Sequence, residues 1–137
     1  DVLITIRGVH TVDEEDNDVE MIVRGDYYQK NGKHYVLYEE LIEGFKEPVK
    51  NIIKITSTSM DITKKGTAIT HMLFEKNRKN VSCYSTPFGE IVVGIQANHF
   101  AVDEQADSLK VNVDYSLDIN YEHMSDCRIL VDVQSCQ

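Results

Sequence analysis

Apolar and polar residues alternate along most of the chain, and turn-forming residues interrupt the alternation about every 8 to 14 residues. The clearest stretch runs from Leu109 to Tyr121. Its apolar positions are Leu109, Val111, Val113, Tyr115, Leu117, Ile119 and Tyr121. Side chains along a β-strand point to opposite faces in turn, so this stretch predicts a long strand with one apolar and one hydrated face.

Ten stretches carry this pattern of period two, and an α-helical period is not found. They cover residues 2–7, 19–28, 33–41, 51–57, 60–64, 67–74, 81–86, 90–98, 109–121 and 127–134. Only residues 101–107 could hold a helical turn. Long strands joined by short turns expose sheet edges unless the sheet closes on itself. The pattern therefore predicts an all-β fold, a closed or nearly closed antiparallel up-and-down barrel of about 8 to 10 strands.

The dipeptide Asn31-Gly32 predicts a tight hairpin turn and fixes its register. Asn and Gly tolerate the positive φ angles of a type I′ turn. The register predicts cross-strand pairs of Tyr28 with Tyr35, Arg24 with Glu39, and Tyr38 with Gly25. The face of this hairpin predicted to point inward carries Met21, Val23, Gly25, Tyr27, Val36, Tyr38, Glu40 and Ile42.

Length and composition are those of a folded globular protein. The 137 residues predict one domain over residues 1–137, with 42% hydrophobic and 27% charged residues. No apolar run is long enough to span a membrane, no basic-then-apolar leader pattern precedes the first predicted strand, and three cysteines are an odd number for a disulfide-stabilised secreted domain. We therefore expect a cytoplasmic protein without a membrane partner.

The net charge of -9 argues against a nucleic-acid partner, because phosphate-backbone binding needs a basic surface. The charge is unevenly distributed. Residues 46–79 hold eight basic and three acidic side chains, a net +5, which leaves -14 for the rest of the chain. Neighbouring basic and acidic strands are the favoured interpretation, and an anion-attracting patch is the alternative.

Three motifs combine turn residues with aromatic or alternating apolar positions: Gly25-Asp26-Tyr27-Tyr28-Gln29-Lys30 followed by Tyr35, Tyr38 and Glu39; Tyr84-Ser85-Thr86-Pro87-Phe88-Gly89; and Leu109-x-Val111-x-Val113-x-Tyr115. Together they resemble the YwiB-like family of small bacterial proteins. The likeness spans nearly the whole chain, although Lys65 precedes Gly66 where the family often has Arg. The resemblance implies a lipocalin-type, or calycin, barrel, and it implies no reaction.

Four residues are candidates for lining a ligand site. Glu40 lies on the hairpin's apolar face within reach of Tyr27 and Tyr38, and Tyr115 lies in the apolar row of the long strand. A carboxylate inside a barrel could orient a ligand or transfer a proton. The alternatives are a solvated Glu40 at the rim and tyrosines that serve ordinary cross-strand packing.

Searches for catalytic and metal motifs find none. The five histidines, His10, His34, His71, His99 and His123, have no metal-binding spacing. The acidic run from Asp13 to Asp18 lacks the glycine and the final carboxylate of an EF-hand loop and predicts a solvated hairpin tip. We therefore expect no cofactor, no metal and no assigned catalytic residue.

These observations favour non-covalent binding of a small, partly apolar molecule in the barrel or at its mouth. A solidly packed core would exclude this role. A cofactor-free lyase or isomerase that uses interior tyrosines with Glu40 is one alternative, and whether the chain is an enzyme stays open. A protein-interaction or structural module is the other, and strands that are apolar on both faces make a homodimer a further expectation.

Overall fold

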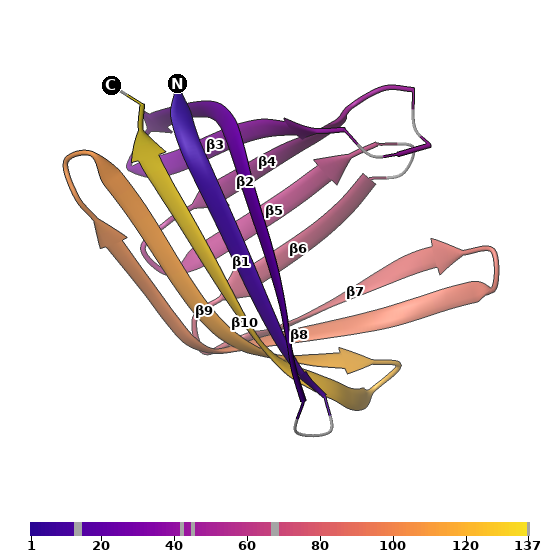
Figure 1. The fold of residues 1–137 in the computed structure, drawn as a ribbon. Helices are drawn as coiled ribbons and strands as arrows, with labels where there is room; N and C mark the ends of the chain where they lie inside the picture. Colours follow the sequence, from indigo (N-terminus) through magenta and orange to yellow (C-terminus); the bar gives the residue numbers. More distant parts are fainter. Residues whose placement is uncertain (13–14, 42, 45, 67–68, 137) are drawn as a thin grey trace.

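A computed structural model describes residues 1–12, 15–41, 43–44, 46–66 and 69–136. Within these residues all regular structure is β (Figure 1). The strands are β1 (Val2–Val12), β2 (Glu15–Lys30), β3 (Lys33–Glu40), β4 (Val49–Ile55), β5 (Ser59–Lys65), β6 (Ile69–Glu75), β7 (Lys79–Thr86), β8 (Gly89–Glu104), β9 (Ser108–Ile119) and β10 (Glu122–Ser135). In the described ranges, no helix is long and apolar enough to cross a membrane.

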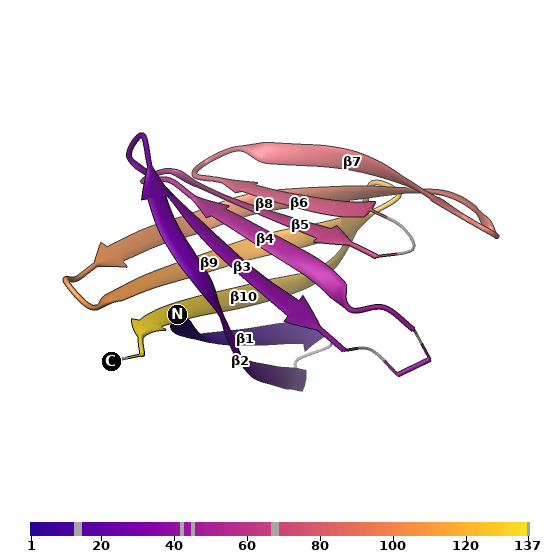
Figure 2. The ribbon, with the colours of Figure 1, turned by 90° about the horizontal axis from the view of Figure 1, so that it is seen from above.

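The ten strands form one antiparallel sheet in the order β6-β5-β4-β3-β2-β1-β10-β9-β8-β7. The first and last strands pair along ten positions, from Val2 with Ser135 to Thr11 with Asp126. The sheet curls so that its two halves face each other across a common interior (Figure 2). The predicted all-β, nearly closed antiparallel up-and-down barrel is confirmed. The helical turn considered for residues 101–107 is wrong, because β8 continues as a strand to Glu104.

The Asn31-Gly32 turn sets the register of β2 and β3 as predicted. Both turn residues have positive φ, 54° and 74°, and pairing runs from Lys30 with Lys33 to Asp26 with Leu37. The rings of Tyr28 and Tyr35 stack at 4.8 Å between centroids.

The predicted pair of Arg24 with Glu39 is wrong, because β2 leaves β3 beyond Asp26. Arg24 instead pairs with Leu3 of β1 and forms an ion pair with Asp1 at 3.8 Å. Tyr38 nevertheless covers Gly25, and its Cβ is 3.1 Å from the point that a glycine Cβ would occupy. The first part of β2 thus belongs to one half of the sheet and the second part to the other.

Apolar side chains from both halves fill the centre of the barrel. The buried core comprises Val2, Ile4, Val36, Tyr38, Ile53, Ile55, Met60, Ile62, Phe74, Ile95, Ala97, Phe100, Leu109, Val111, Val113, Tyr115, Cys127, Val131 and Val133. Phe74 of β6 packs its ring edge against Tyr115 of β9 at a centroid distance of 4.9 Å. The centre is therefore packed, and free space lies at the ends of the barrel and along one side.

That side is the seam between β6 and β7, which follow each other in the chain but share no strand pairing among the described residues. Figure 1 shows the backbone of the β7 and β8 hairpin diverging from that of β6. Side chains link the two: the Tyr84 hydroxyl donates to the His71 carbonyl, and Asn80 Nδ2 donates to the Leu73 carbonyl. The barrel is therefore interrupted in the middle of the chain rather than between its first and last strands.

Candidate functional site

The structure distributes the four predicted site residues over three places. Tyr38 and Glu40 lie near each other at the end of β3, where the Glu40 charge contributes to raising the pKa of Tyr38. Tyr27 lies toward the opposite end of the hairpin, beside His34. Tyr115 is buried in the core against Phe74 and Cys127. Only Tyr38 and Glu40 are thus brought together.

A polar row crosses the inner face of the sheet beside Glu40. Strand pairing aligns Tyr38, Asn51, Lys64 and Thr70, contributed by β3, β4, β5 and β6. The next row inward is apolar and consists of Val36, Ile53, Ile62 and Met72. The inner face therefore changes from polar to apolar over two residues of each strand.

Asn51 is the most deeply buried polar side chain of that row, with 1% of its surface exposed. Its Nδ2 donates to the Val49 carbonyl at 3.2 Å, whereas its Oδ1 has no hydrogen-bond partner among the described residues. A buried acceptor without a donor costs about 1 to 3 kcal/mol. Asn51 is therefore an acceptor available to a hydrogen-bond donor in the barrel.

Lys64 forms the polar edge of a pocket in the seam. The pocket has a volume of about 360 Å³ and is lined by Ile62, Lys64, Thr70, Met72, Tyr84 and Val93. We call it the seam pocket. Its walls are inner-face side chains of β5 and β6 on one side and of β7 and β8 on the other. Met72, Tyr84 and Val93 are partly exposed at this seam, whereas Ile62 is buried.

A second pocket shares Lys64 and Thr70 with the seam pocket. Its volume is about 770 Å³, and its charged lining residues are Lys46, Glu47, Lys50, Lys64 and Lys65. We call it the lysine pocket. Lys64 Nζ is 3.3 Å from Glu40 Oε1, with 46% of the lysine side chain and 21% of the glutamate side chain exposed. Glu40 is thus neither an unpaired buried carboxylate nor a fully solvated rim residue.

Glu40→Gln is expected to lower the free energy of unfolding by less than about 1 kcal/mol, because a partly exposed ion pair contributes little. Equilibrium urea unfolding at low and high salt measures the change, and the small loss should shrink as salt screens the pair. A gain in stability would mean that the carboxylate is buried without a partner.

At the opposite end of the hairpin, Tyr27, His34 and Glu104 lie in contact in this order. The sequence did not predict this cluster. His34 is 6% exposed; its Nδ1 lies 2.6 Å from the Tyr27 hydroxyl and its Nε2 lies 3.4 Å from Glu104 Oε1. The Tyr27 hydroxyl and His34 Nδ1 share a hydrogen bond whose donor depends on the imidazole tautomer, and Glu104 lies at ion-pair distance from Nε2. A phenol, an imidazole and a carboxylate in this order are groups that proton transfer can use.

A pocket of about 610 Å³ adjoins this cluster, and we call it the terminal pocket. Both ends of the described chain contribute to it, and its polar lining includes Tyr27, Gln29, Glu104, Asp107 and Ser108. Val2, Leu109 and Val133 supply apolar walls. Among the described residues, no three His, Cys, Asp or Glu side chains gather as ligands for a metal ion.

Burial raises the pKa of three tyrosines. The loss of hydration is the main cause for Tyr27, Tyr38 and Tyr115, and the neighbouring Glu104, Glu40 and Cys127 add to it respectively. A folded-state pKa above the unfolded value of about 10 favours the neutral phenol in the folded protein. This contribution to stability is complete below about pH 10 and is lost as the pH rises above that value.

We therefore expect stability to fall steeply above about pH 10, and Tyr38→Phe to make that fall shallower. Urea unfolding across this pH range, with phenolate absorbance followed in parallel, measures both effects. Tyr121→Phe is the matched control because Tyr121 is 80% exposed. An equal effect of the two substitutions would contradict the role assigned to burial.

Comparison with known proteins places the chain in a family. The family described as "Domain of unknown function (DUF1934)" matches residues 4–131. The chain belongs to this family. A search of curated proteins gave no significant match.

Among solved structures, the chain is similar to one described as the crystal structure of ywiB protein from Bacillus subtilis. The TM-score is 0.81 at 18% sequence identity, over 99% of this chain and 92% of that chain. The likeness supports the YwiB-like resemblance predicted from the sequence. At this identity it shows the shared fold, and the nearly closed barrel is therefore common to both proteins.

Proposed function

We propose that the protein binds a small, partly apolar molecule non-covalently in the seam pocket, because the packed core excludes the interior of the barrel as the binding site expected from the sequence. The observation that carries the proposal is the interruption between β6 and β7, which exposes apolar inner-face side chains in a concave site. Ligand sites are typically concave and mostly apolar, with a few polar groups that fix orientation. Here Met72, Tyr84 and Val93 line the apolar part and Lys64 lines the polar edge.

Two of the residues predicted from the sequence belong to the surroundings of this site. Glu40 is bonded to Lys64, and Tyr38 lies in the same polar row. Tyr115 supports the pocket indirectly, since it holds Phe74 of β6 against the other half of the barrel. Tyr27 lines the terminal pocket instead.

The proposal is tested with N-phenyl-1-naphthylamine, a neutral apolar dye whose fluorescence rises on leaving water. We expect saturable binding to the wild-type protein. Val93→Phe fills the seam pocket and should weaken binding at least about tenfold, equivalent to about 1.4 kcal/mol. Val81→Phe is the matched control, because Val81 lies on the other face of the same hairpin and is 55% exposed.

If Val93→Phe does not fold, Thr70→Phe blocks the same pocket from the exposed end of β6. Circular dichroism establishes that each variant keeps the β-fold. Dye binding that survives both blocking substitutions would place the ligand elsewhere, and absence of saturable binding to the wild type would refute the proposal.

A second candidate function, proton transfer without a cofactor, is favoured by the chain of Tyr27, His34 and Glu104 at the terminal pocket. The reaction class would be proton abstraction beside a carbonyl group, as in a lyase or isomerase. Deuterium exchange at such positions in a panel of small keto acids, followed by NMR in heavy water, tests it. Exchange that is absent, or unchanged in His34→Gln, would exclude this function.

A further inference from the structure

We propose that the ligand of the seam pocket is an amphipathic organic anion, with its apolar body between β6 and β7 and its charged head at the lysine pocket. This inference rests on the function proposed above and adds the chemical class of the ligand. Its basis is that the two pockets adjoin at Lys64 and Thr70, which line both of them.

Lysine side chains dominate the charge at the position of the ligand's head. The lysine pocket is lined by four lysines and one carboxylate, Glu47, and Glu40 contacts it through Lys64. The lining of the pocket itself is therefore net positive, and Glu39, which pairs with Lys50 on the neighbouring strand, offsets part of that charge. An anion gains from this arrangement, and its attraction is strongest where a low-dielectric wall adjoins the charges.

Apolar side chains line the position of the ligand's body. In the next row inward from the polar row, the inner face carries Ile62 and Met72. Val93 of β8 faces them across the pocket. A ligand that spans this boundary must be charged at one end and apolar at the other. A fully polar anion would leave the apolar walls uncovered, and a neutral apolar molecule would leave the lysines unpaired.

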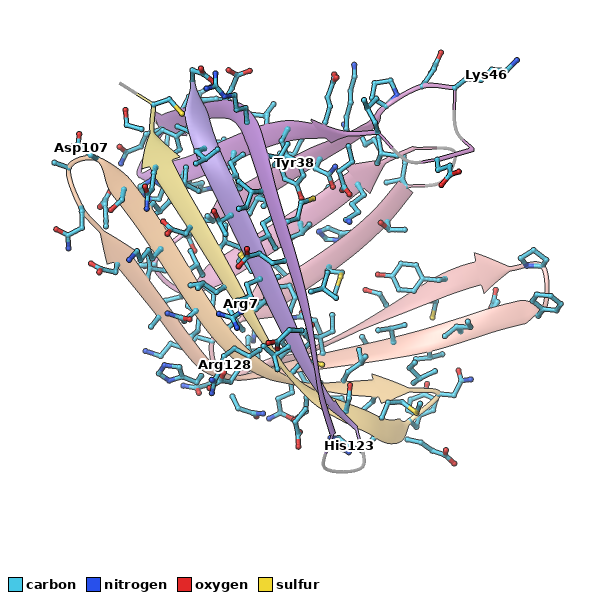
Figure 3. All side chains as sticks on the ribbon, viewed as in Figure 1. Arg7, Tyr38, Lys46, Asp107, His123 and Arg128 are labelled. Carbon is cyan, nitrogen blue, oxygen red and sulfur yellow. The ribbon has the colours of Figure 1, made fainter. Side chains whose placement is uncertain are left out.

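The distribution of charged residues over the rest of the molecule also favours an anion at this end of the barrel. Lys46 and Asp107 lie at opposite ends of the barrel (Figure 3), and the terminal pocket at the Asp107 end is lined by Asp1, Glu104 and Asp107 without a lysine or arginine. Residues 46–79 hold the positive excess of a chain whose net charge is -9. The lysine pocket is therefore where we place the anion-attracting patch that the sequence left as an alternative.

Lys64 is the charged group at the same boundary, and strand pairing places it between Asn51 and Thr70 in the polar row. Lys64 is shared between Glu40 and the approaching head, so its position governs both contacts. Lys64 is therefore the residue on which recognition of the charge depends.

The test uses two dyes that differ by one sulfonate, the neutral N-phenyl-1-naphthylamine and the anionic 8-anilino-1-naphthalenesulfonate. At low salt we expect the wild type to bind the anionic dye at least about fivefold more tightly, and added salt should weaken only that dye. Lys64→Met should weaken the anionic dye about five- to tenfold and leave the neutral dye within about twofold. Glu40→Gln, which releases Lys64, should strengthen binding of the anionic dye.

Lys54→Met is the control for net charge, because Lys54 is on β4 but does not line either pocket. The thermal unfolding midpoint of each variant shows whether the variant is folded at the temperature of the dye measurements. Equal affinity for the two dyes, or equal effects of Lys64→Met and Lys54→Met, would overturn the inference and leave the proposed function standing. If neither dye binds the wild type, both proposals fail.

Discussion

Phe74→Ala is expected to lower the free energy of unfolding by about 3 to 5 kcal/mol, which is a large part of the stability of a small protein. Phe74 is fully buried on β6, and its ring meets Tyr115 of β9 edge to face. Removal of the ring takes away apolar contacts and leaves a cavity that the surrounding sheet closes only in part.

The position of Phe74 should make the loss of stability larger than the buried apolar area of its ring alone implies. β6 is the terminal strand of its half of the sheet, and no backbone pairing joins it to β7 in the described residues. The contact with Tyr115 therefore holds β6 across the interior where hydrogen bonds between strands do not. Weakening it should also loosen the wall of the seam pocket.

Urea unfolding of wild type and variant gives the change in free energy, and hydrogen exchange shows whether β6 opens first. Ile69→Ala on the same strand is the matched control, since Ile69 is 70% exposed and its truncation should cost no more than about 0.5 kcal/mol. A loss below about 1 kcal/mol for Phe74→Ala would show that the ring is not packed between the two halves.

Local sequence signals were sufficient to predict the strands and one hairpin register. The alternation of period two follows from strand geometry, so it located ten segments that correspond to the ten observed strands. The Asn31-Gly32 turn fixed the pairs from Lys30 with Lys33 to Asp26 with Leu37, because a two-residue turn leaves no freedom of stagger.

The interactions that the sequence did not predict depend on which strands meet away from a turn. Arg24 was assigned to Glu39, but β2 turns toward β1 at Gly25, and periodicity contains no signal for that departure. His34 and Glu104 lie far apart in sequence and meet only after the barrel forms. Their residue types gave no spacing motif by which the contact could be found.

The seam was missed for a related reason. Closure was expected as a property of the whole sheet, and β1 does pair with β10 as closure requires. Whether β6 also pairs with β7 is decided by the turn at Asn77 and by the parallel bridge from Lys76 to Ala97 of β8, which ties the connection to a different strand. The seam pocket, and with it the importance of Lys64, follows from that local arrangement.

Gly25→Ala is expected to destabilise the protein by about 1 to 3 kcal/mol. A side chain has no room at the corner of the sheet, the point at Gly25 where β2 changes its partner strand from β1 to β3. A Cβ on Gly25 would lie 2.3 Å from the Leu37 carbonyl oxygen and 2.7 Å from Ile4 Cδ1. The first of these atoms belongs to the backbone of β3, so the added methyl group cannot be accommodated by rotation of a side chain alone. The strand would have to shift where β2 passes from one half of the sheet to the other.

Gly8→Ala provides a control with the opposite sign. A Cβ on Gly8 meets nothing within 4 Å, and alanine in a strand loses less conformational freedom on folding than glycine, so this variant should gain about 0.5 to 1 kcal/mol. Urea unfolding of the two variants under the same conditions measures the contrast. If Gly25→Ala were as stable as Gly8→Ala, β2 and β3 would have to separate at Gly25 by more than the structure shows, and the corner would not depend on glycine.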